Sequence, residues 1–271
     1  MTQEVRLKGI EILPEISERI KENVCMIIAR LDHRFNNVDI QKLITDASSL
    51  HAMNIICKGT GFLISTGYVV TAYHVIENAY KIECLTPQGW IDLKLAKYSK
   101  QHDIALLKPE IKWSKGIDIK LEVIPHLRKG EIVFTLGYPL TYYDLEPILS
   151  VGFLSSIQER NGVKRLIVNA AFNVGNSGGP LLNLQGDLLG IVVAKSVFIE
   201  PLMNDILQVL RKPGVDLVYN TVRLPGGISE VITLSKVIQT IVKWVRNNIQ
   251  TNIGEAVSVE HLVQLLVNKL R

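Results

Sequence analysis

A series of short apolar segments between residues 53 and 195 constrains the fold of this chain more than any other feature. Many of them alternate apolar and polar positions, and turn residues separate them. Many short strands at regular spacing are typical of a β-sandwich or a β-barrel. The segments are MNIIC (53–57), GFLIS (61–65), YVVTA (68–72), KIECL (81–85), IDLKLAKY (91–98), IALLK (104–108), EIVFTLG (131–137), ILSVGFLSSI (148–157), RLIVNA (165–170), GPLLN (179–183) and LLGIVVA (188–194).

The rest of the chain predicts a linker and several helices. The stretch 109–127, with its prolines and Gly116, is the best candidate for a linker between two β units. The apolar run 24–31 predicts a further strand. Apolar residues at helical spacing predict helices over 14–22, 38–50, 202–210, 235–249 and 259–270.

Composition excludes several classes of protein. The chain has 271 residues, of which 47% are hydrophobic and 21% charged, so it is not intrinsically disordered. The net charge is +4 and like charges do not cluster, so neither nucleic acid nor an anionic membrane is indicated as a partner. Three widely spaced cysteines predict neither a disulfide framework nor a zinc site. No segment reads as a signal peptide or a transmembrane helix, so we expect a cytoplasmic protein.

Three short motifs hold a histidine, a carboxylate and a serine in this order: TAYHV with His74, HDIALL with Asp103, and NVGNSGGPL with Ser177. A neutral histidine can take the proton of a serine hydroxyl, and a buried carboxylate holds the imidazole in one tautomer. The backbone N–H groups of Gly175 and Ser177 can stabilise an oxyanion, because glycine lets a loop turn its amides inward. A plain Gly-rich turn would explain Ser177 but not the two partner motifs.

The motifs TAYH, DIALL and GNSGGP resemble those of chymotrypsin-fold serine proteases, and the HtrA/Deg-like branch is the most similar. GTGFLIS (59–65) and GISEVITLSKV (227–237) add to this resemblance. It covers roughly residues 14–31 and 53–248, and it excludes two apparent insertions at about 32–52 and 197–225.

The resemblance implies an all-β fold of two antiparallel six-stranded β-barrels with added helices. The active site is expected in the cleft between the barrels. We expect an N-terminal barrel over 14–115, a C-terminal barrel over 116–234 and C-terminal helices over 235–271, together forming one protease unit. The residues after about 249 are too few for a PDZ domain of the kind that HtrA-type proteins carry.

Several positions depart from the pattern of the family. Asn176 replaces the aspartate that pairs with a new N-terminal ammonium in trypsin-like enzymes, so ordering of loop 171–176 is the expected switch. Val193 replaces a serine that holds the triad aspartate in many relatives. The motif alignment places in the S1 pocket Ala171, Phe172, Val193, Ala194, Lys195, Ile228 and Ser229. None of these is acidic, which predicts cleavage after small or medium apolar residues.

The sequence therefore predicts a serine endopeptidase that acts on unfolded or extended protein segments. Ser177 would attack, His74 would serve as base and then acid, and Asp103 would orient His74. No cofactor or metal is implied, the expected partner is a protein or peptide substrate, and a homo-oligomer is left open. The alternative is a catalytically idle or latent binding module or chaperone on the same scaffold.

Overall fold

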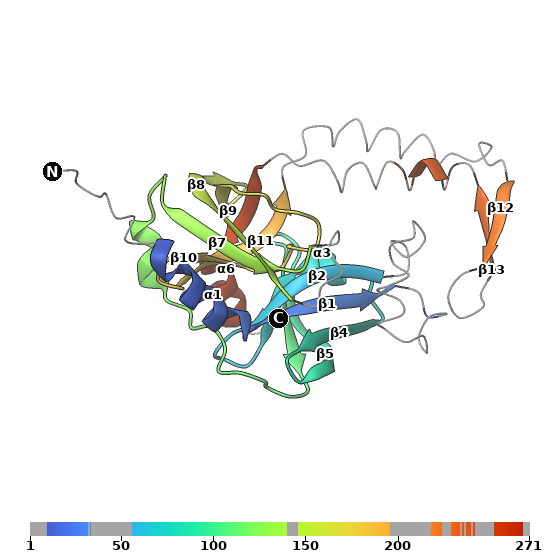
Figure 1. The fold of residues 1–271 in the computed structure, drawn as a ribbon, viewed down its shortest axis with the longest axis horizontal. Coiled ribbons are helices and arrows are strands. Elements are labelled where there is room, and N and C mark those ends of the chain that lie inside the picture. Colours follow the sequence, from blue (N-terminus) through green and yellow to red (C-terminus); the bar gives the residue numbers. More distant parts are fainter. Residues whose placement is uncertain are drawn as a thin grey trace.

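The computed structural model shows two β-barrels packed side by side (Figure 1). This confirms the predicted fold class of two antiparallel six-stranded barrels with added helices. The structure describes residues 10–31, 33, 56–139, 146–195, 218–223, 229–233, 235, 237–239, 241 and 252–267.

The first barrel is closed by six strands in the order β1-β2-β3-β6-β5-β4. The expected segments 53–57 and 61–65 contribute to a single strand, because the Lys-Gly-Thr sequence between them stays extended and pairs with β1. The strands are β1 (Val24–Arg30), β2 (Ile56–Leu63), β3 (Val69–Ala72), β4 (Lys81–Thr86), β5 (Gly89–Ser99) and β6 (Ile104–Pro109).

The second barrel is closed in the order β10-β11-β14-β9-β8-β7. Its strands are β7 (Ile132–Gly137), β8 (Ile148–Arg160), β9 (Val163–Asn169), β10 (Pro180–Asn183), β11 (Leu188–Lys195) and β14 (Gly254–Ser258). Residues 110–131 join the two barrels and contain the 3-10 helix η4 (Leu121–His126), where we expected the linker.

The sixth strand of the second barrel is not the segment that the sequence predicted. We expected the segment 227–234 in this barrel and only helices after residue 235. Instead β13 (Ser229–Thr233) pairs with β12 (Val218–Arg223) in a separate two-stranded sheet, and β14 inserts between β11 and β9. Both edges of β14 pair with a neighbouring strand, so closure of the barrel by tertiary pairing decided between the two short segments.

The helices within the described residues are few and short. The 3-10 helix η1 (Ile10–Ile12) leads into α1 (Leu13–Lys21), which buries its apolar face as expected over 14–22. The short α3 (Tyr73–Ile76) follows β3, and α6 (Val259–Val267) follows β14. Ser235, residues 237–239 and Ile241 are helical, while the helices expected over 38–50 and 202–210 lie outside the described residues. No helix of the described residues is long and apolar enough to cross a membrane.

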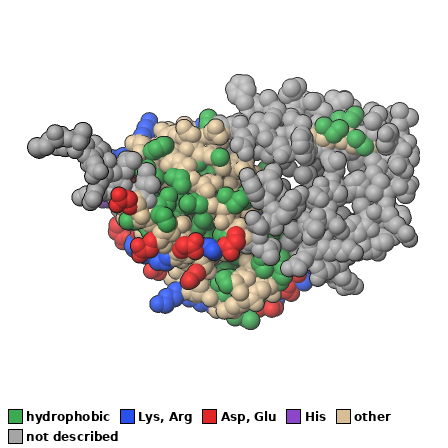
Figure 2. Space-filling view, in the orientation of Figure 1, with side chains coloured by type: hydrophobic (Ala, Val, Ile, Leu, Met, Phe, Trp, Pro, Cys, Tyr) green, Lys and Arg blue, Asp and Glu red, His purple; other side chains and the backbone are tan. Residues whose placement is uncertain are grey.

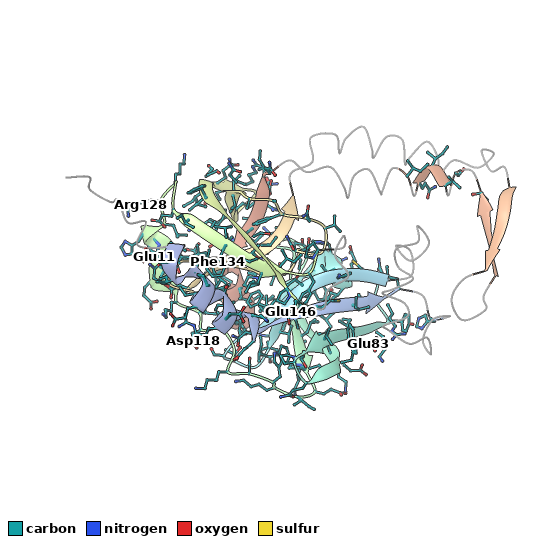
Figure 3. The ribbon with its side chains drawn as sticks, viewed as in Figure 1. Glu11, Glu83, Asp118, Arg128, Phe134 and Glu146 are labelled. Atoms are coloured by element: carbon teal, nitrogen blue, oxygen red, sulfur yellow. The ribbon has the colours of Figure 1, made fainter. Side chains whose placement is uncertain are left out.

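A buried ion pair joins neighbouring strands of the first barrel. Arg30 Nε lies 2.6 Å from Glu83 Oε2, and the two side chains are 4% and 8% exposed. Lys81 Nζ approaches the other carboxylate oxygen of Glu83 at 2.9 Å. Figure 3 shows Glu83 at this barrel, whereas the buried Phe134 belongs to β7 of the other. Removing either partner would leave a buried charge uncompensated, so the pair favours this register of β1 and β4.

The outward face of β8 carries a row of apolar side chains. Leu149, Val151, Phe153 and Ile157 alternate along the strand and are each more than a third exposed. Apolar side chains are also visible among the charged ones on the face drawn in Figure 2.

Gly190 tests whether β14 closes the second barrel. A Cβ at this position of β11 would lie 2.4 Å from the carbonyl oxygen of Val257 in β14. We expect Gly190→Ala to lower the free energy of unfolding by about 1–3 kcal/mol, because backbone has to shift. Denaturant unfolding measures this, with Val151→Ala on the exposed face of β8 as a control that changes stability by less than about 0.5 kcal/mol. Equal stability of Gly190→Ala and the parent would contradict this packing.

Candidate active site

The pairing of β3 with β6 brings His74 and Asp103 together, although 29 residues separate them. Ala72 is paired with Ile104, so the residues just beyond this pair, in α3 and in the turn before β6, lie next to each other. The backbone confirms the proximity, since Tyr73 N–H donates to the carbonyl of Asp103 at 3.1 Å.

The carboxylate of Asp103 contacts His74 at two points. Asp103 Oδ2 lies 2.6 Å from His74 Nδ1, and Asp103 Oδ1 accepts a bond of 2.8 Å from the backbone N–H of His74. With Nδ1 donating to the carboxylate, Nε2 is left as the acceptor of the ring. Asp103 has φ 54°, a left-handed conformation that aspartate tolerates better than most residues. The backbone N–H of His74 thus orients Asp103 without the hydroxyl that Val193 lacks.

Two glycines allow the loop of Ser177 to pack closely against the segment that holds His74. A Cβ on Gly178 would lie 2.8 Å from the backbone nitrogen of Ala72, two residues before His74. A Cβ on Gly59 would lie 2.5 Å from Val75 and 3.2 Å from the carbonyl oxygen of Ser177. Only residues without side chains permit this close approach between the serine loop and the segment 72–75 that carries His74.

The loop before Ser177 forms a tight turn. Asn176 N–H donates to the carbonyl of Asn173 at 3.0 Å, and Gly175, the third residue of the turn, has φ 102°. A positive φ at the third position is the mark of a type II turn. This turn type flips the central peptide relative to type I, so it sets the direction of the Gly175 N–H.

The amides around Ser177 differ in how they are used. Gly178 N–H donates to Val192 and Gly179 N–H donates to Asn176, at 2.6 and 2.9 Å. In the part of the chain that the structure describes, the N–H groups of Gly175 and Ser177 donate to no backbone carbonyl. Two unused amides beside a serine are the arrangement that an oxyanion hole requires.

The structure separates the expected substrate-binding residues into two groups. Phe172 and Val193 are buried in the second barrel, Ala171 is exposed, and Ala194 and Lys195 pair with β14. Ser229 instead lies in the β12–β13 sheet opposite Arg223, and Ile228 lies outside the described residues.

Gly254 of β14 lies against Phe172, where the alignment led us to expect Ile228 and Ser229. A Cβ there would lie 1.9 Å from Cδ2 of Phe172, so the aromatic ring rests on the backbone of β14. The sequence analysis missed Gly254, because the short segment IGEAV (253–257) has no apolar-polar alternation that would indicate a strand.

A stacked histidine pair lies beside the turn of Asp103. The rings of His102 and His261 on α6 are 4.2 Å apart at an angle of 17°, and His102 Nδ1 lies 3.0 Å from Ser99 Oγ. His261 Nε2 accepts the N–H of Lys164 at 2.9 Å. Burial lowers the pKa of His102, and the nearby His261 and Arg165 lower it further. Among the described residues, no group of three or more His, Cys, Asp or Glu side chains is arranged to hold a metal ion.

Comparison with known families bears on the same stretch of chain. A family model described as a trypsin-like peptidase domain matches residues 59–191, from β2 to β11. The chain contains a trypsin-like peptidase domain. His74, Asp103 and Ser177 all lie within the matched residues of this domain.

Curated relatives of the peptidase domain are HtrA- and Deg-type proteins. "Serine protease HTRA1B" of Danio rerio is 31% identical over 185 residues, which are 61% of this chain and 38% of that protein. "Protease Do-like 1, chloroplastic" of Arabidopsis thaliana is 33% identical over 147 residues, 51% of this chain and 33% of that protein. The chain thus spans about a third of the length of these relatives.

Solved structures share the fold. The structure named "HtrA-type protease AlgW with decapeptide" has a TM-score of 0.58 at 15% identity, and the match covers 93% of this chain and 66% of that one. The active form of the Rv3671c protease from M. tuberculosis has a TM-score of 0.55 at 19% identity, with 69% and 76% covered. At these identities the match shows the fold alone.

His102 makes the stability of the peptidase domain depend on pH. Its pKa is lowered in the folded state, so the folded chain resists a proton that the unfolded chain accepts. The stabilising contribution is present above the ordinary histidine pKa of about 6.5 and is lost as pH falls below it. We expect the fall in Tm between pH 7 and pH 5 to be smaller in His102→Phe, which keeps the stack but cannot titrate. His126→Phe, at an exposed site, should leave that fall unchanged, and an equal effect of both variants would contradict the prediction.

Proposed function

We propose that this protein is a serine endopeptidase in which Ser177 attacks the scissile carbonyl. His74 Nε2 takes the serine proton and later passes it to the leaving amine, and Asp103 stabilises the imidazolium. The N–H groups of Gly175 and Ser177 receive the negative charge of the tetrahedral intermediate. The proposal rests above all on the two-point contact between Asp103 and His74, because it fixes the tautomer whose free nitrogen is a base.

The direction of the Ser177 amide supports its role. In a trans peptide the N–H and the preceding C=O point to opposite sides. The carbonyl of Asn176 accepts the N–H of Gly179 at 2.9 Å, so the N–H of Ser177 in the same peptide points away from that bond. The names of the relatives agree with this chemistry, since one is called a serine protease and the other a protease, and one structural neighbour holds a decapeptide.

The edge of β11 favours an extended substrate. Residues 193–195 follow the part of β11 that pairs with β10. In the described chain Ala194 and Lys195 pair with β14 on one side only, and Val193 lies at a register shift between the two strands. An open strand edge beside a nucleophile can accept a peptide as an additional strand. Unfolded or extended segments present such a backbone, so they are the substrate class that this edge supports.

One observation favours a latent enzyme at rest. Within the described residues, the hydroxyl of Ser177 makes no hydrogen bond to His74, and the side chain of His74 is 43% exposed. Catalytic hydrogen bonds often tighten only when substrate is bound. The alternative function is therefore a latent or idle module that binds peptide on the same scaffold.

Replacement of the nucleophile tests the endopeptidase proposal. We expect the wild-type chain to react with a fluorophosphonate probe and Ser177→Ala not to react. Its kcat on a peptide substrate should fall by about 10⁴–10⁶ with the fold intact. Ser155→Ala, at an exposed serine of β8, is the control that keeps full labelling. A wild-type chain that is folded but resists the probe would favour the binding module.

Phe172 should limit the size of the P1 side chain, which belongs to the residue just before the cleaved bond. Its ring, packed on Gly254, takes up room at the base of the proposed S1 pocket, so small or medium apolar P1 residues are expected. Phe172→Ala should shift the preference toward larger apolar residues such as Phe, by about 10-fold or more in relative kcat/KM. Profiling with a peptide library measures this, and Ser229→Ala should leave the profile unchanged. Preference of the parent for Arg or Lys at P1 would refute the apolar pocket.

A further inference from the structure

The side chain of Thr60 joins three separate parts of the chain near Ser177. Thr60 lies on β2 of the first barrel and is fully buried. Its hydroxyl donates to the carbonyl of Gly175 at 2.6 Å and accepts the N–H of Tyr138 at 3.0 Å. Tyr138 follows β7 of the second barrel, so one hydroxyl contacts the serine loop and the end of β7 together.

Only one assignment of donor and acceptor is possible for the two hydrogen bonds of the Thr60 hydroxyl. A backbone N–H can only donate and a carbonyl can only accept, so the single proton of the Thr60 hydroxyl goes to Gly175. A Cβ on Gly137 would lie 3.0 Å from the Thr60 hydroxyl and 2.7 Å from Asn176 Oδ1. The hydroxyl therefore occupies a closely packed site that a glycine keeps open.

Thr60 restrains the peptides on both sides of the one that carries the Ser177 amide. The peptide between Gly175 and Asn176 is held by the Thr60 hydroxyl at its carbonyl and by Asn173 at its N–H. The peptide between Ser177 and Gly178 is held by Thr60 N–H at its carbonyl, at 2.8 Å, and by Val192 at its N–H. Among the described residues, the peptide between them is held only through the carbonyl of Asn176, and its N–H makes no hydrogen bond.

We infer that Thr60 is a positioning residue for the oxyanion hole, acting from the first barrel on the loop of the second. The inference rests on the proposed endopeptidase function. The hydroxyl fixes the plane of the Gly175–Asn176 peptide and so maintains the type II turn in which Gly175 has a positive φ. Without it, the carbonyl of Gly175 has no donor in place and the turn can exchange its central peptide for the type I orientation. The Gly175 amide would then point away from the oxyanion.

Isosteric pairs of variants test this role. Thr60→Val keeps the shape and removes the hydroxyl, and Thr60→Ser against Thr60→Ala makes the same comparison if the valine variant does not fold. Thr86→Val is the matched control. The hydroxyl of this buried residue of the first barrel also donates to one carbonyl, that of Gly89, and accepts one N–H, that of Gln88, in the β4–β5 hairpin.

Two readouts keep the inference separate from the proposed function. Hydrogen exchange of residues 173–179 reports on the turn whether or not the chain is an enzyme. It should speed up in Thr60→Val and Thr60→Ala and stay near the parent rate in Thr60→Ser and Thr86→Val. Loss of one oxyanion donor costs about 10²–10³ in kcat, so a misdirected donor should lower kcat and fluorophosphonate labelling by about 10- to 100-fold, with KM nearly unchanged.

These measurements have three distinguishable outcomes. Faster exchange with a loss in kcat that Thr60→Ser restores supports the inference. Unchanged exchange in Thr60→Val, or equal losses in Thr60→Val and Thr86→Val, overturns it. If the parent chain does not react with the probe, the endopeptidase proposal fails, and the exchange data still decide whether Thr60 orders the turn.

Discussion

The candidate site depends on the contact between the serine loop of the second barrel and strands β2 and β3 of the first. Thr60 N–H donates to the carbonyl of Ser177, and Gly178 lies against Thr60, Thr71 and Ala72 with no room for a side chain. His74 and Asp103 belong to the first barrel, and Ser177 belongs to the second. Without this backbone contact, the three side chains would be present, but the two barrels would not hold them close to one another.

The contact explains why glycine recurs in the motif GNSGGP. Gly178 has φ 89°. A Cβ at this position would lie only 2.1 Å from the carbonyl oxygen of Thr60. Gly175 needs its positive φ for the turn. The motif therefore encodes two different restraints, a close approach between barrels and a turn type, and each is independent of the chemistry of the serine.

Sequence patterns predicted the parts of the fold that local residues determine. The short strands, the linker between the barrels and the order of the three motifs follow from periodicity, turn residues and spacing. The same patterns did not show which of two segments, 229–233 or Gly254–Ser258, is the sixth strand of the second barrel. Both segments are short, and each lies near or contains a glycine. Only the partners decide which strand enters the barrel, and in this chain the partners are β9 and β11, far away in the sequence. The error carried over to the expected S1 pocket, for which the sequence analysis named Ser229 and not Gly254, the residue that lies against Phe172.

The bonding of Asp103 illustrates a second limit of sequence reasoning. The valine at position 193 left the orientation of Asp103 without an explanation, because a search for side-chain partners overlooks backbone donors. The structure supplies the N–H of His74 itself, at 2.8 Å. A backbone N–H is present in every residue except proline, so it leaves no signature in the sequence. The bond is seen only when the turn before β6 is placed beside the start of α3.

The neutral Asn176 fits a loop that hydrogen bonds keep in order. Its side chain is buried, and among the described residues its Oδ1 accepts no hydrogen bond. A carboxylate in this position would need a cation, because a buried unpaired charge is far more costly than an unpaired amide oxygen. The order of the loop rests instead on neutral bonds to Asn173, Thr60 and Val192, which exist as soon as the barrels pack. Such a site can form without cleavage of a precursor. Neutral bonds of modest net strength also allow the loop to open. This agrees with the described part of the structure, in which the Ser177 hydroxyl makes no hydrogen bond to His74.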